Sequence, residues 1–265
     1  MFELIRNYKD NVRCTYEEPE INIYNESYYK EQCGGFKEFN RSNGEELDSS
    51  RHAVLNLCPL ESSYSALDVG CGRGELVLAL ARQGLEYVAG IDLSEDSIKL
   101  AREVCEKQII SQQVTIQRMS ATSLEFNDNL FNVIYMTDVV EHLCDSNLKI
   151  AISEAYRALK PGGKLIIHTL PTVNYKLYGQ YLTKYYLALQ GRKWWTPTTR
   201  EEAGIGHVNI QSKKSLESYL HKSFKSKNTN VFYAPVNPEG ILKKLISCLN
   251  IWNIMSPHLW AVAIK

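Results

Sequence analysis

The sequence lacks the features that mark several classes of protein. Its 265 residues hold 30 Lys and Arg against 30 Asp and Glu, so the formal net charge is zero. Proteins that bind nucleic acid are usually basic, and we expect no nucleic-acid partner here. No run approaches the ~18 to 20 apolar residues of a membrane span, and the start, MFELIRNYKDNVRC, lacks the apolar stretch of a secretory signal. We therefore predict a cytoplasmic protein without a transmembrane segment.

Paired cysteines are also missing. The seven cysteines never form a C-x-x-C pair, whereas zinc sites and disulfide frameworks need paired spacing. Asp138, Glu141 and His142 are close in sequence, but no second cluster completes an oxygen-rich metal site. The sequence thus predicts free thiols and no bound metal.

The two halves of the chain carry opposite net charges. Residues 1–159 carry 15 basic and 26 acidic side chains, a net of −11, and residues 160–265 carry 15 and 4, a net of +11. Either the halves simply solvate different faces, or the second half receives an anionic acceptor or a membrane surface.

Between residues 66 and 169, apolar runs of strand type alternate with stretches that favour helices. Strands are expected at Ala66–Gly70, Tyr87–Asp92, Val114–Met119, Phe131–Thr137 and Lys164–Thr169. Helices are expected over Glu75–Arg82, after Ser94, and from Asp145 or Ser146 to the break at Pro161-Gly162-Gly163. Such alternation produces a mainly parallel sheet that is covered on both faces.

The alternation of strand and helix patterns stops after residue 170. Aromatic and apolar residues recur at helical spacing from Tyr175 to Leu189, and Trp194 and Trp195 follow, which indicates an inserted helical cap. The predicted fold class is α/β, with a Rossmann-like, seven-stranded, mainly parallel sheet, helices on both faces and this cap. The predicted parts are an N-terminal helical lid (1–60), a cofactor-binding core (61–170), an acceptor cap (171–210) and a C-terminal completion of the core (211–265).

The sharpest signal is the segment LDVGCGRGE at residues 67–75, which lies where the first strand turns into the first helix. Its glycines permit a tight turn and let a ligand approach the backbone closely. A dinucleotide loop would read G-x-G-x-x-G and would hold a pyrophosphate, but here Asp68 and Glu75 place negative charge at that point. Asp92, which ends the second strand, can accept both hydroxyls of a ribose. The pattern favours a nucleoside ligand that carries positive charge.

At this point the chain resembles a known family. LDVGCGRGE, GIDLS (90–94), MSATSL (119–124), FNVIYMTDVVEHL (131–143) and LKPGGKLIIHTLP (159–171) are similar to the ordered motifs of class I S-adenosylmethionine-dependent methyltransferases. The resemblance implies S-adenosyl-L-methionine as cofactor and S-adenosyl-L-homocysteine as product. The cofactor-binding residues that it implies are Asp68, Gly70, Cys71, Gly72, Gly74, Asp92, Leu93, Ser120, Ala121 and Thr137. Arg51 is either a further contact, with the cofactor carboxylate, or an ordinary surface arginine.

Two positions depart from the family pattern. Ser120 stands where an aspartate usually meets the adenine amino group, and Asn132 replaces the aspartate of the usual Phe-Asp pair. A hydroxyl still accepts a hydrogen bond, although more weakly than a carboxylate.

Candidate catalytic residues follow the fourth strand and the insertion. Glu141, His142 and His207 are predicted to lie at the reacting end, where an imidazole of ordinary pKa near 6.5 suits proton removal at neutral pH. Each also has a structural interpretation, as a helix start or a hydrogen-bonded core histidine, and His168 within a strand pattern is assigned to the core. The predicted acceptor-binding residues are Tyr28, Tyr29, Tyr175, Tyr178, Trp194 and Trp195.

These observations predict a methyltransferase that acts on a small or carrier-linked acceptor, by O-methylation in glycan, lipid or natural-product biosynthesis. The basic second half of the chain is consistent with an anionic acceptor. The alternatives are a protein or RNA methyltransferase, or a catalytically silent scaffold subunit that binds the cofactor. Within residues 239–252, Lys243 and Lys244 interrupt the apolar residues Ile241, Leu242, Leu245, Ile246, Leu249 and Trp252, so this stretch is either a buried crossover helix or a peripheral membrane contact.

Overall fold

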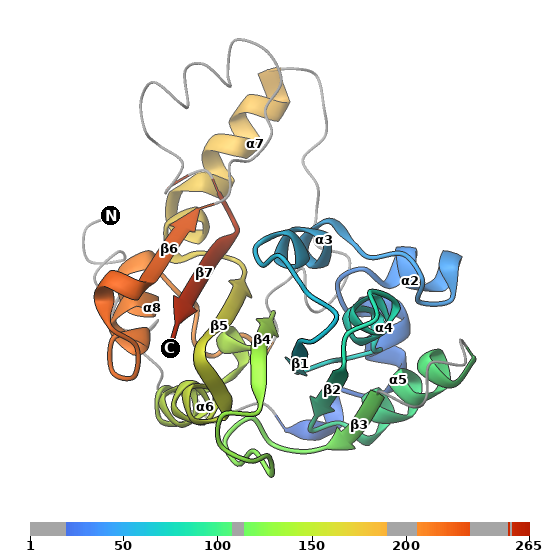
Figure 1. The fold of residues 1–265 in the computed structure, drawn as a ribbon. Coiled ribbons are helices and arrows are strands. Elements are labelled where there is room, and N and C mark those ends of the chain that lie inside the picture. Colours follow the sequence, from blue (N-terminus) through green and yellow to red (C-terminus); the bar gives the residue numbers. More distant parts are fainter. Residues whose placement is uncertain (1–19, 108–113, 190–205, 234–253, 255) are drawn as a thin grey trace.

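The computed structural model describes residues 20–107, 114–189, 206–233, 254 and 256–265 (Figure 1). Its centre is one seven-stranded sheet in the order β3-β2-β1-β4-β5-β7-β6. The strands are β1 (Ser65–Val69), β2 (Tyr87–Asp92), β3 (Val114–Arg118), β4 (Phe131–Thr137), β5 (Leu159–Thr169), β6 (Thr229–Tyr233) and β7 (Leu259–Ile264). Strands β1 to β5 are parallel, and β7 runs antiparallel to both β5 and β6. The predicted fold class is therefore confirmed.

Helices cover both faces of the sheet and bury two apolar clusters. On one face pack α3 (Ser49–Asn56), α4 (Glu75–Arg82) and α5 (Glu95–Lys107), and on the other pack α6 (Asp145–Ala158) and α8 (Lys213–Leu220). The burial follows from spacing, because α4 offers Leu76, Val77 and Leu80 to the sheet while Arg82 remains partly exposed. Helices that connect parallel strands across both faces of a sheet leave an open crevice at the carboxyl ends of the strands.

Shorter elements lie at the N-terminal side and around the insertion. They are the 3-10 turns η1 (Ile21–Ile23), η3 (Val140–His142) and η5 (Ser226–Asn228), the π-helical turns η2 (Tyr28–Gln32) and η4 (Tyr175–Gly179), and helices α2 (Phe36–Ser42) and α7 (Gln180–Leu189). In Figure 1, α7 rises beyond the end of the sheet. Among the described residues no helix has both the length and the apolarity needed to cross a bilayer.

One predicted boundary was wrong. The helix expected to end at Pro161-Gly162-Gly163 ends instead at Ala158, and β5 begins at Leu159. The register between β4 and β5 shifts, since Phe131 pairs with Leu159 but Val133 pairs with Lys164. The Pro-Gly-Gly segment therefore forms a bulge within the strand, and Gly162 adopts φ +79° there.

Candidate active site

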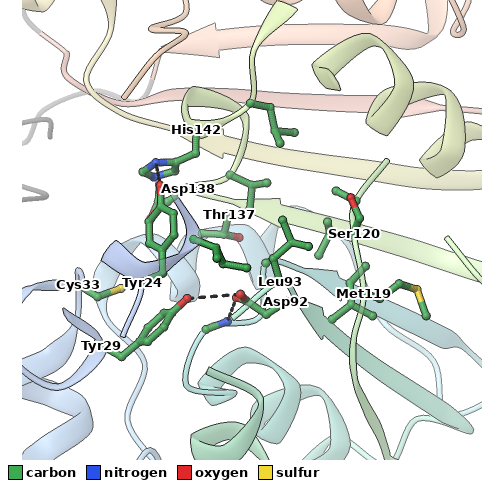
Figure 2. Close-up of a pocket in the computed structure, with 18 of the residues that line it drawn as sticks. Tyr24, Tyr29, Cys33, Asp92, Leu93, Met119, Ser120, Thr137, Asp138 and His142 are labelled. Atoms are coloured by element: carbon green, nitrogen blue, oxygen red, sulfur yellow. Dashed lines mark hydrogen bonds between the residues drawn. The ribbon is translucent and has the colours of Figure 1, made fainter. Parts of the chain in front are cut away.

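A cavity opens at the carboxyl ends of β1, β2 and β4 (Figure 2). We call one part the glycine-loop end, defined by Gly70, Gly72, Asp92 and Leu93. We call the other the histidine end, defined by Thr137, Asp138 and His142 in the cavity wall, with Glu141 and His207 beside His142. Tyr24, Tyr28, Tyr29 and Cys33 from the N-terminal side complete the wall.

The three glycines of the loop differ in what they make room for. All have positive φ, at +73° for Gly70, +53° for Gly72 and +86° for Gly74. A Cβ on Gly70 would lie 2.4 Å from Val139, and a Cβ on Gly74 would lie 2.8 Å from Ala101, so both permit close packing. A Cβ on Gly72 would meet only the Tyr29 ring, at 3.7 Å. Gly72 is thus the position where the backbone is open to the cavity.

Asp92 is held in place by backbone amides. Its Oδ2 accepts from the amide of Gly72 at 3.0 Å, and its Oδ1 accepts from the amide of Ser94 at 2.9 Å. The Tyr29 hydroxyl donates to Oδ1 at 3.4 Å (Figure 2). Burial raises the pKa of Asp92, while the two amides lower it. The side chain is therefore a preorganised acceptor at the cavity wall.

Asp68 lies under the loop and is only 3% exposed. Burial, followed by the charges of Glu75 and Asp92, raises its pKa to about 8, although Arg51 acts in the opposite direction. The carboxyl is consequently protonated at neutral pH. A cation that enters the adjoining cavity would favour release of this proton.

Arg73 was missed by sequence reasoning, which assigned it no role. It is 1% exposed, and its Nε donates to Glu75 at 2.8 Å. Its other nitrogens donate to the main-chain oxygens of Tyr29, at 2.5 Å, and Gly34, at 2.6 Å. The guanidinium also lies 5.0 Å from the Phe39 ring centroid. Arg73 thus ties the N-terminal segment to the glycine loop.

Arg51 comes from the first turn of α3, which Asp48 caps by accepting from the amides of Ser50 and Arg51. It lines the cavity as predicted for a cofactor contact, and it forms an ion pair with the Asp48 carboxylate. Burial alone would lower the pKa of Arg51, but the carboxylates of Glu75 and Asp48 raise it well above its usual value. A permanent positive charge therefore faces the cavity.

At the histidine end, His142 is placed by the 3-10 turn that follows β4. Its Nδ1 lies 2.9 Å from the Tyr24 hydroxyl and 3.1 Å from the main-chain oxygen of Gly206 (Figure 2). Burial lowers the pKa of His142, so its ring is neutral at pH 7. The contacts bring together three segments that are far apart in the sequence.

Glu141 and His207 lie beside His142 but outside the residues that line the cavity. The Glu141 carboxylate accepts from the Thr169 hydroxyl at 2.8 Å, and burial together with the charge of Asp138 raises its pKa well above the usual range. The His207 ring stands edge-on to His142, with centroids 4.8 Å apart. Burial lowers the pKa of His207 to about 3.

Asp138 also lines the cavity, and no catalytic role was predicted for it from the sequence. It adopts φ +58°, and its Oδ1 lies 2.6 Å from Nδ1 of His168. His168 is fully buried in β5, in agreement with its assignment to the core, and its Nε2 lies 2.9 Å from Nδ1 of His258. Burial alone would raise the pKa of Asp138, but His168 and Arg51 hold it below its usual value. The cavity thus contains a carboxylate that is ionised at neutral pH.

The structure brings most of the predicted cofactor residues to one cavity and separates the rest. Those in the cavity wall are Arg51, Gly70, Gly72, Asp92, Leu93, Ser120, Ala121 and Thr137. Asp68, Cys71 and Gly74 lie behind the loop, where Cys71 packs under Gly90. These three support the loop without lining the cavity.

The predicted acceptor residues divide in the same way. Tyr28 and Tyr29 line the cavity, at the N-terminal side. Tyr175 and Tyr178 are on η4 and do not line it, and 39% of the Tyr178 surface is exposed. Trp194 and Trp195 lie outside the described residues, as does the stretch 239–252.

The two departures from the family pattern have different consequences. Asn132 Oδ1 accepts from the amide of Ser65, at 2.9 Å, and from Nζ of Lys160, at 2.9 Å, so it joins β1, β4 and β5 away from the cavity. Ser120 does line the cavity, and its hydroxyl lies 2.8 Å from that of Thr122. Only the second departure touches the site.

Residues 67–167 match the profile of a family described as "Methyltransferase domain". The matched stretch runs from β1 to β5, and it contains the glycine loop and Asp92. The chain carries a class I S-adenosylmethionine-dependent methyltransferase domain. The resemblance described from the sequence motifs is thereby confirmed for this domain.

Curated relatives of the methyltransferase domain have varied names. A demethylmenaquinone methyltransferase of Lactiplantibacillus plantarum is 35% identical over 109 residues, which are 40% of this chain and 45% of that protein. Phosphoethanolamine N-methyltransferase 2 of Caenorhabditis elegans is 31% identical over 169 residues, 62% of this chain and 37% of that protein. The chain therefore spans less than half the length of these relatives.

A solved structure has the same fold. Phosphoethanolamine N-methyltransferase 2 of Haemonchus contortus, in complex with S-adenosyl-L-methionine, superposes with a TM-score of 0.57 at 21% identity. The match covers 81% of this chain and 52% of that one.

The residues of the cavity fit the cofactor of the methyltransferase domain. Gly72 leaves the backbone open where a side chain would intrude, and Asp92 presents two fixed carboxylate oxygens beside it. Leu93 is 44% exposed and lines the same wall, so it offers an apolar surface for a flat ring. When bound, S-adenosyl-L-methionine supplies an activated methyl group on a sulfonium.

Proposed function

We propose that this protein transfers a methyl group from S-adenosyl-L-methionine to a small or carrier-linked acceptor. The observation that carries the proposal is the continuity of the cavity. Its wall runs from Gly72 and Asp92 at the glycine-loop end to Asp138 and His142 at the histidine end. One cavity thus adjoins both a nucleoside-type site and a group of titratable side chains, which is the arrangement that direct transfer needs.

We further propose that the acceptor is an oxygen nucleophile and that its proton leaves toward the histidine end. His142 is neutral at pH 7 and lies in the cavity wall, within hydrogen-bond distance of the Tyr24 hydroxyl. A neutral imidazole can take a proton from a hydroxyl as the oxygen attacks. Such an acceptor is consistent with glycan, lipid or natural-product biosynthesis.

An amine acceptor is a second candidate, and Asp138 favours it. This carboxylate lines the cavity and is ionised at neutral pH because His168 and Arg51 stabilise its charge. A carboxylate in that position would bind an ammonium group, which would lose a proton to the neutral His142 before its nitrogen attacks the methyl group. One relative is named as an N-methyltransferase of phosphoethanolamine, which also bears an amine.

The first experiment is calorimetric titration with S-adenosyl-L-methionine and S-adenosyl-L-homocysteine, with NAD as the control. We expect micromolar binding of the first two and none of NAD, because the loop lacks the G-x-G-x-x-G spacing of a pyrophosphate site and its Gly72 amide already donates to Asp92. No binding of either sulfur compound would refute the proposal.

A second step separates the acceptor classes. The protein is incubated with methyl-labelled cofactor and with panels of hydroxyl and amine acceptors, and transfer of label is measured. Transfer to hydroxyl compounds supports the first candidate, and transfer to amines alone supports the second. Cofactor binding without transfer to any acceptor favours the scaffold alternative.

A further inference from the structure

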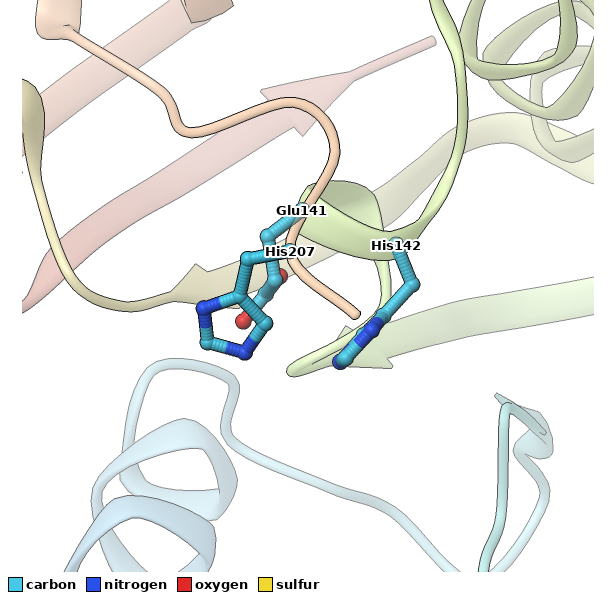
Figure 3. Close-up of side chains that lie close together, drawn as sticks. All are labelled: Glu141, His142 and His207. Atoms are coloured by element: carbon cyan, nitrogen blue, oxygen red, sulfur yellow. The ribbon is translucent and has the colours of Figure 1, made fainter. Parts of the chain in front are cut away.

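Three side chains at the histidine end form a cluster with the composition of a metal site. Glu141, His142 and His207 each offer one ligand atom, and these atoms all lie within 4.8 Å of one another (Figure 3). Two come from the turn after β4, and His207 comes from the far side of the insertion, so the fold alone brings them together. Two imidazoles and one carboxylate form a ligand set found in catalytic zinc sites and in mononuclear iron sites.

The surroundings of His142 fix which nitrogen is available. The Gly206 carbonyl oxygen, 3.1 Å from Nδ1, can only accept a hydrogen bond, and the Tyr24 hydroxyl, 2.9 Å from the same atom, is able to accept one as well. Both contacts are therefore satisfied together when Nδ1 carries the proton. In a neutral ring, Nε2 then has a free lone pair. Histidine ligands of metals are typically held in this way, with the other ring nitrogen donating to a backbone carbonyl.

Glu141 is supported from behind in a similar manner. Its Oε2 accepts from the Thr169 hydroxyl at 2.8 Å, and its Oε1 accepts from the Leu170 amide at 3.4 Å. Each oxygen keeps a second lone pair. The residue is only 1% exposed, and a carboxylate buried to this extent is stable as an anion only beside positive charge.

His207 supplies an independent observation. Its Nδ1 is buried and makes no hydrogen bond to any described residue. Buried polar atoms normally have a partner, and an orphaned one calls for an explanation. The main chain beside this ring is anchored, because the amides of Val208 and Asn209 both donate to the Glu141 carbonyl oxygen, at 2.9 and 3.0 Å.

We propose that Glu141, His142 and His207 bind one divalent transition-metal ion of the Zn²⁺ type at the histidine end of the cavity. Bonds of about 2.0 to 2.2 Å in a tetrahedron place ligand atoms about 3.3 to 3.6 Å apart, so the cluster must contract by at most about 1.5 Å. Three protein ligands leave a coordination position open, as in catalytic sites. The adjoining cavity wall contains His142 and Asp138.

An ion at this place would deepen the proposed function, and this part of the inference depends on that function. A divalent ion lowers the pKa of a hydroxyl that it binds, whose proton then passes to water. The acceptor oxygen would thereby be a nucleophile at neutral pH without a strong base. Glu141, His142 and His207 would then act on the acceptor through the ion.

The test measures metal binding directly on the full chain, free of any affinity tag. The protein is stripped with a chelator and titrated with Co²⁺, whose visible absorption reports coordination by nitrogen and oxygen, and Zn²⁺ retained after dialysis is measured by elemental analysis. We expect one ion per chain. We expect His207→Ala to weaken binding by more than about 100-fold, since loss of even a supporting residue costs about 10- to 100-fold.

His221→Ala is the matched control, because His221 is an exposed histidine at the end of α8. It should bind the ion as the native chain does. Glu141→Gln is the second variant, in case His207→Ala fails to fold, and it should also lose the ion. Circular dichroism verifies the fold of each variant. No retained ion in the native chain, or equal binding by folded His207→Ala, overturns the proposal.

Failure of this proposal is distinguishable from failure of the proposed function. Calorimetry with S-adenosyl-L-methionine on the stripped protein tests the cofactor site alone, because Gly72 and Asp92 belong to the glycine-loop end. Cofactor binding and methyl transfer in the presence of chelator would reject the metal and leave the function intact. Metal binding without cofactor binding would support the metal site and reject the proposed function.

Discussion

The two ends of the cavity are built in different ways. At the glycine-loop end, contiguous residues on β1, β2 and the turns that follow them are held by backbone amides, as Gly72 and Ser94 hold Asp92. At the histidine end, the contacts join Tyr24, His142 and Gly206 across the whole chain. A ligand site made from one β-α-β unit depends on a short stretch of sequence, whereas the second site depends on how distant loops meet.

The largest expected effect concerns the tie between the N-terminal segment and the glycine loop. Arg73→Met leaves the Glu75 carboxylate buried without its cation and releases the carbonyls of Tyr29 and Gly34. We expect the free energy of unfolding, measured by urea denaturation, to fall by about 3 to 5 kcal/mol. Arg82→Met, which removes a more exposed arginine at the end of α4, should cost less than about 1 kcal/mol. Equal effects of the two variants would show that the tie has no energetic importance.

The next effect tests the glycine-loop end itself. Asp92→Ala removes two fixed acceptor oxygens, and loss of two charged hydrogen bonds should weaken S-adenosyl-L-methionine binding by about 100-fold or more in calorimetry. Glu95→Ala, an exposed acid three residues further on, should bind normally. Undiminished affinity of Asp92→Ala would refute the assignment of this end to the cofactor.

At the histidine end the expected loss is in turnover. His142→Ala and His207→Ala should each reduce the rate of methyl transfer by about 100-fold, while the cofactor dissociation constant changes by less than about twofold. His221→Ala again serves as the control. Normal turnover in both variants would contradict the proposal that the histidine end acts in methyl transfer while the glycine-loop end binds the cofactor.

A smaller effect depends on pH and on Asp68. The folded chain keeps a proton on this carboxyl up to about pH 8, whereas the unfolded chain releases it near the ordinary pKa of 3.8. The free energy of unfolding should therefore fall with rising pH between about 5 and 7, by about 1.4 kcal/mol per pH unit from this group. Asp68→Asn should lack this contribution. Urea denaturation at several pH values measures it, and parallel curves for both proteins would contradict it.

The smallest effect concerns α7. Tyr181 and Tyr185 are 65% and 67% exposed and lie outside the cavity wall. Tyr181→Ser and Tyr185→Ser should change stability by less than about 0.5 kcal/mol and leave cofactor binding unchanged. If the KM for an acceptor nevertheless rises, the prediction that residues 171–210 form an acceptor cap gains support.

The fold was predictable because its signals are local. The Gly70-Cys71-Gly72 turn, the acid at position 92 and the alternation of strands with helices all appear within short stretches of sequence. The start of β5 was not predictable in this way, because Pro161-Gly162-Gly163 ends a helix in most sequences. Here it bulges between Leu159 and Lys164, both of which pair with β4.

The site was predictable only in part. Asp92 and Gly72 follow from the motif, but nothing near Arg73 indicates that its partners are carbonyl oxygens some 40 residues earlier in the chain. The pairing of Asp138 with His168 likewise depends on the neighbouring positions of β4 and β5. Contacts between residues distant in sequence leave no periodic pattern, so reasoning from short segments does not reveal them.

The hydrogen bonds of Arg73 have a consequence for how this chain can vary. The guanidinium contacts main-chain oxygens of the N-terminal segment and makes no hydrogen bond to its side chains among the described residues. Many different sequences can present carbonyl oxygens along the same backbone path. The covering segment can therefore exchange its side chains, including those that face the cavity, while its attachment to the glycine loop is preserved.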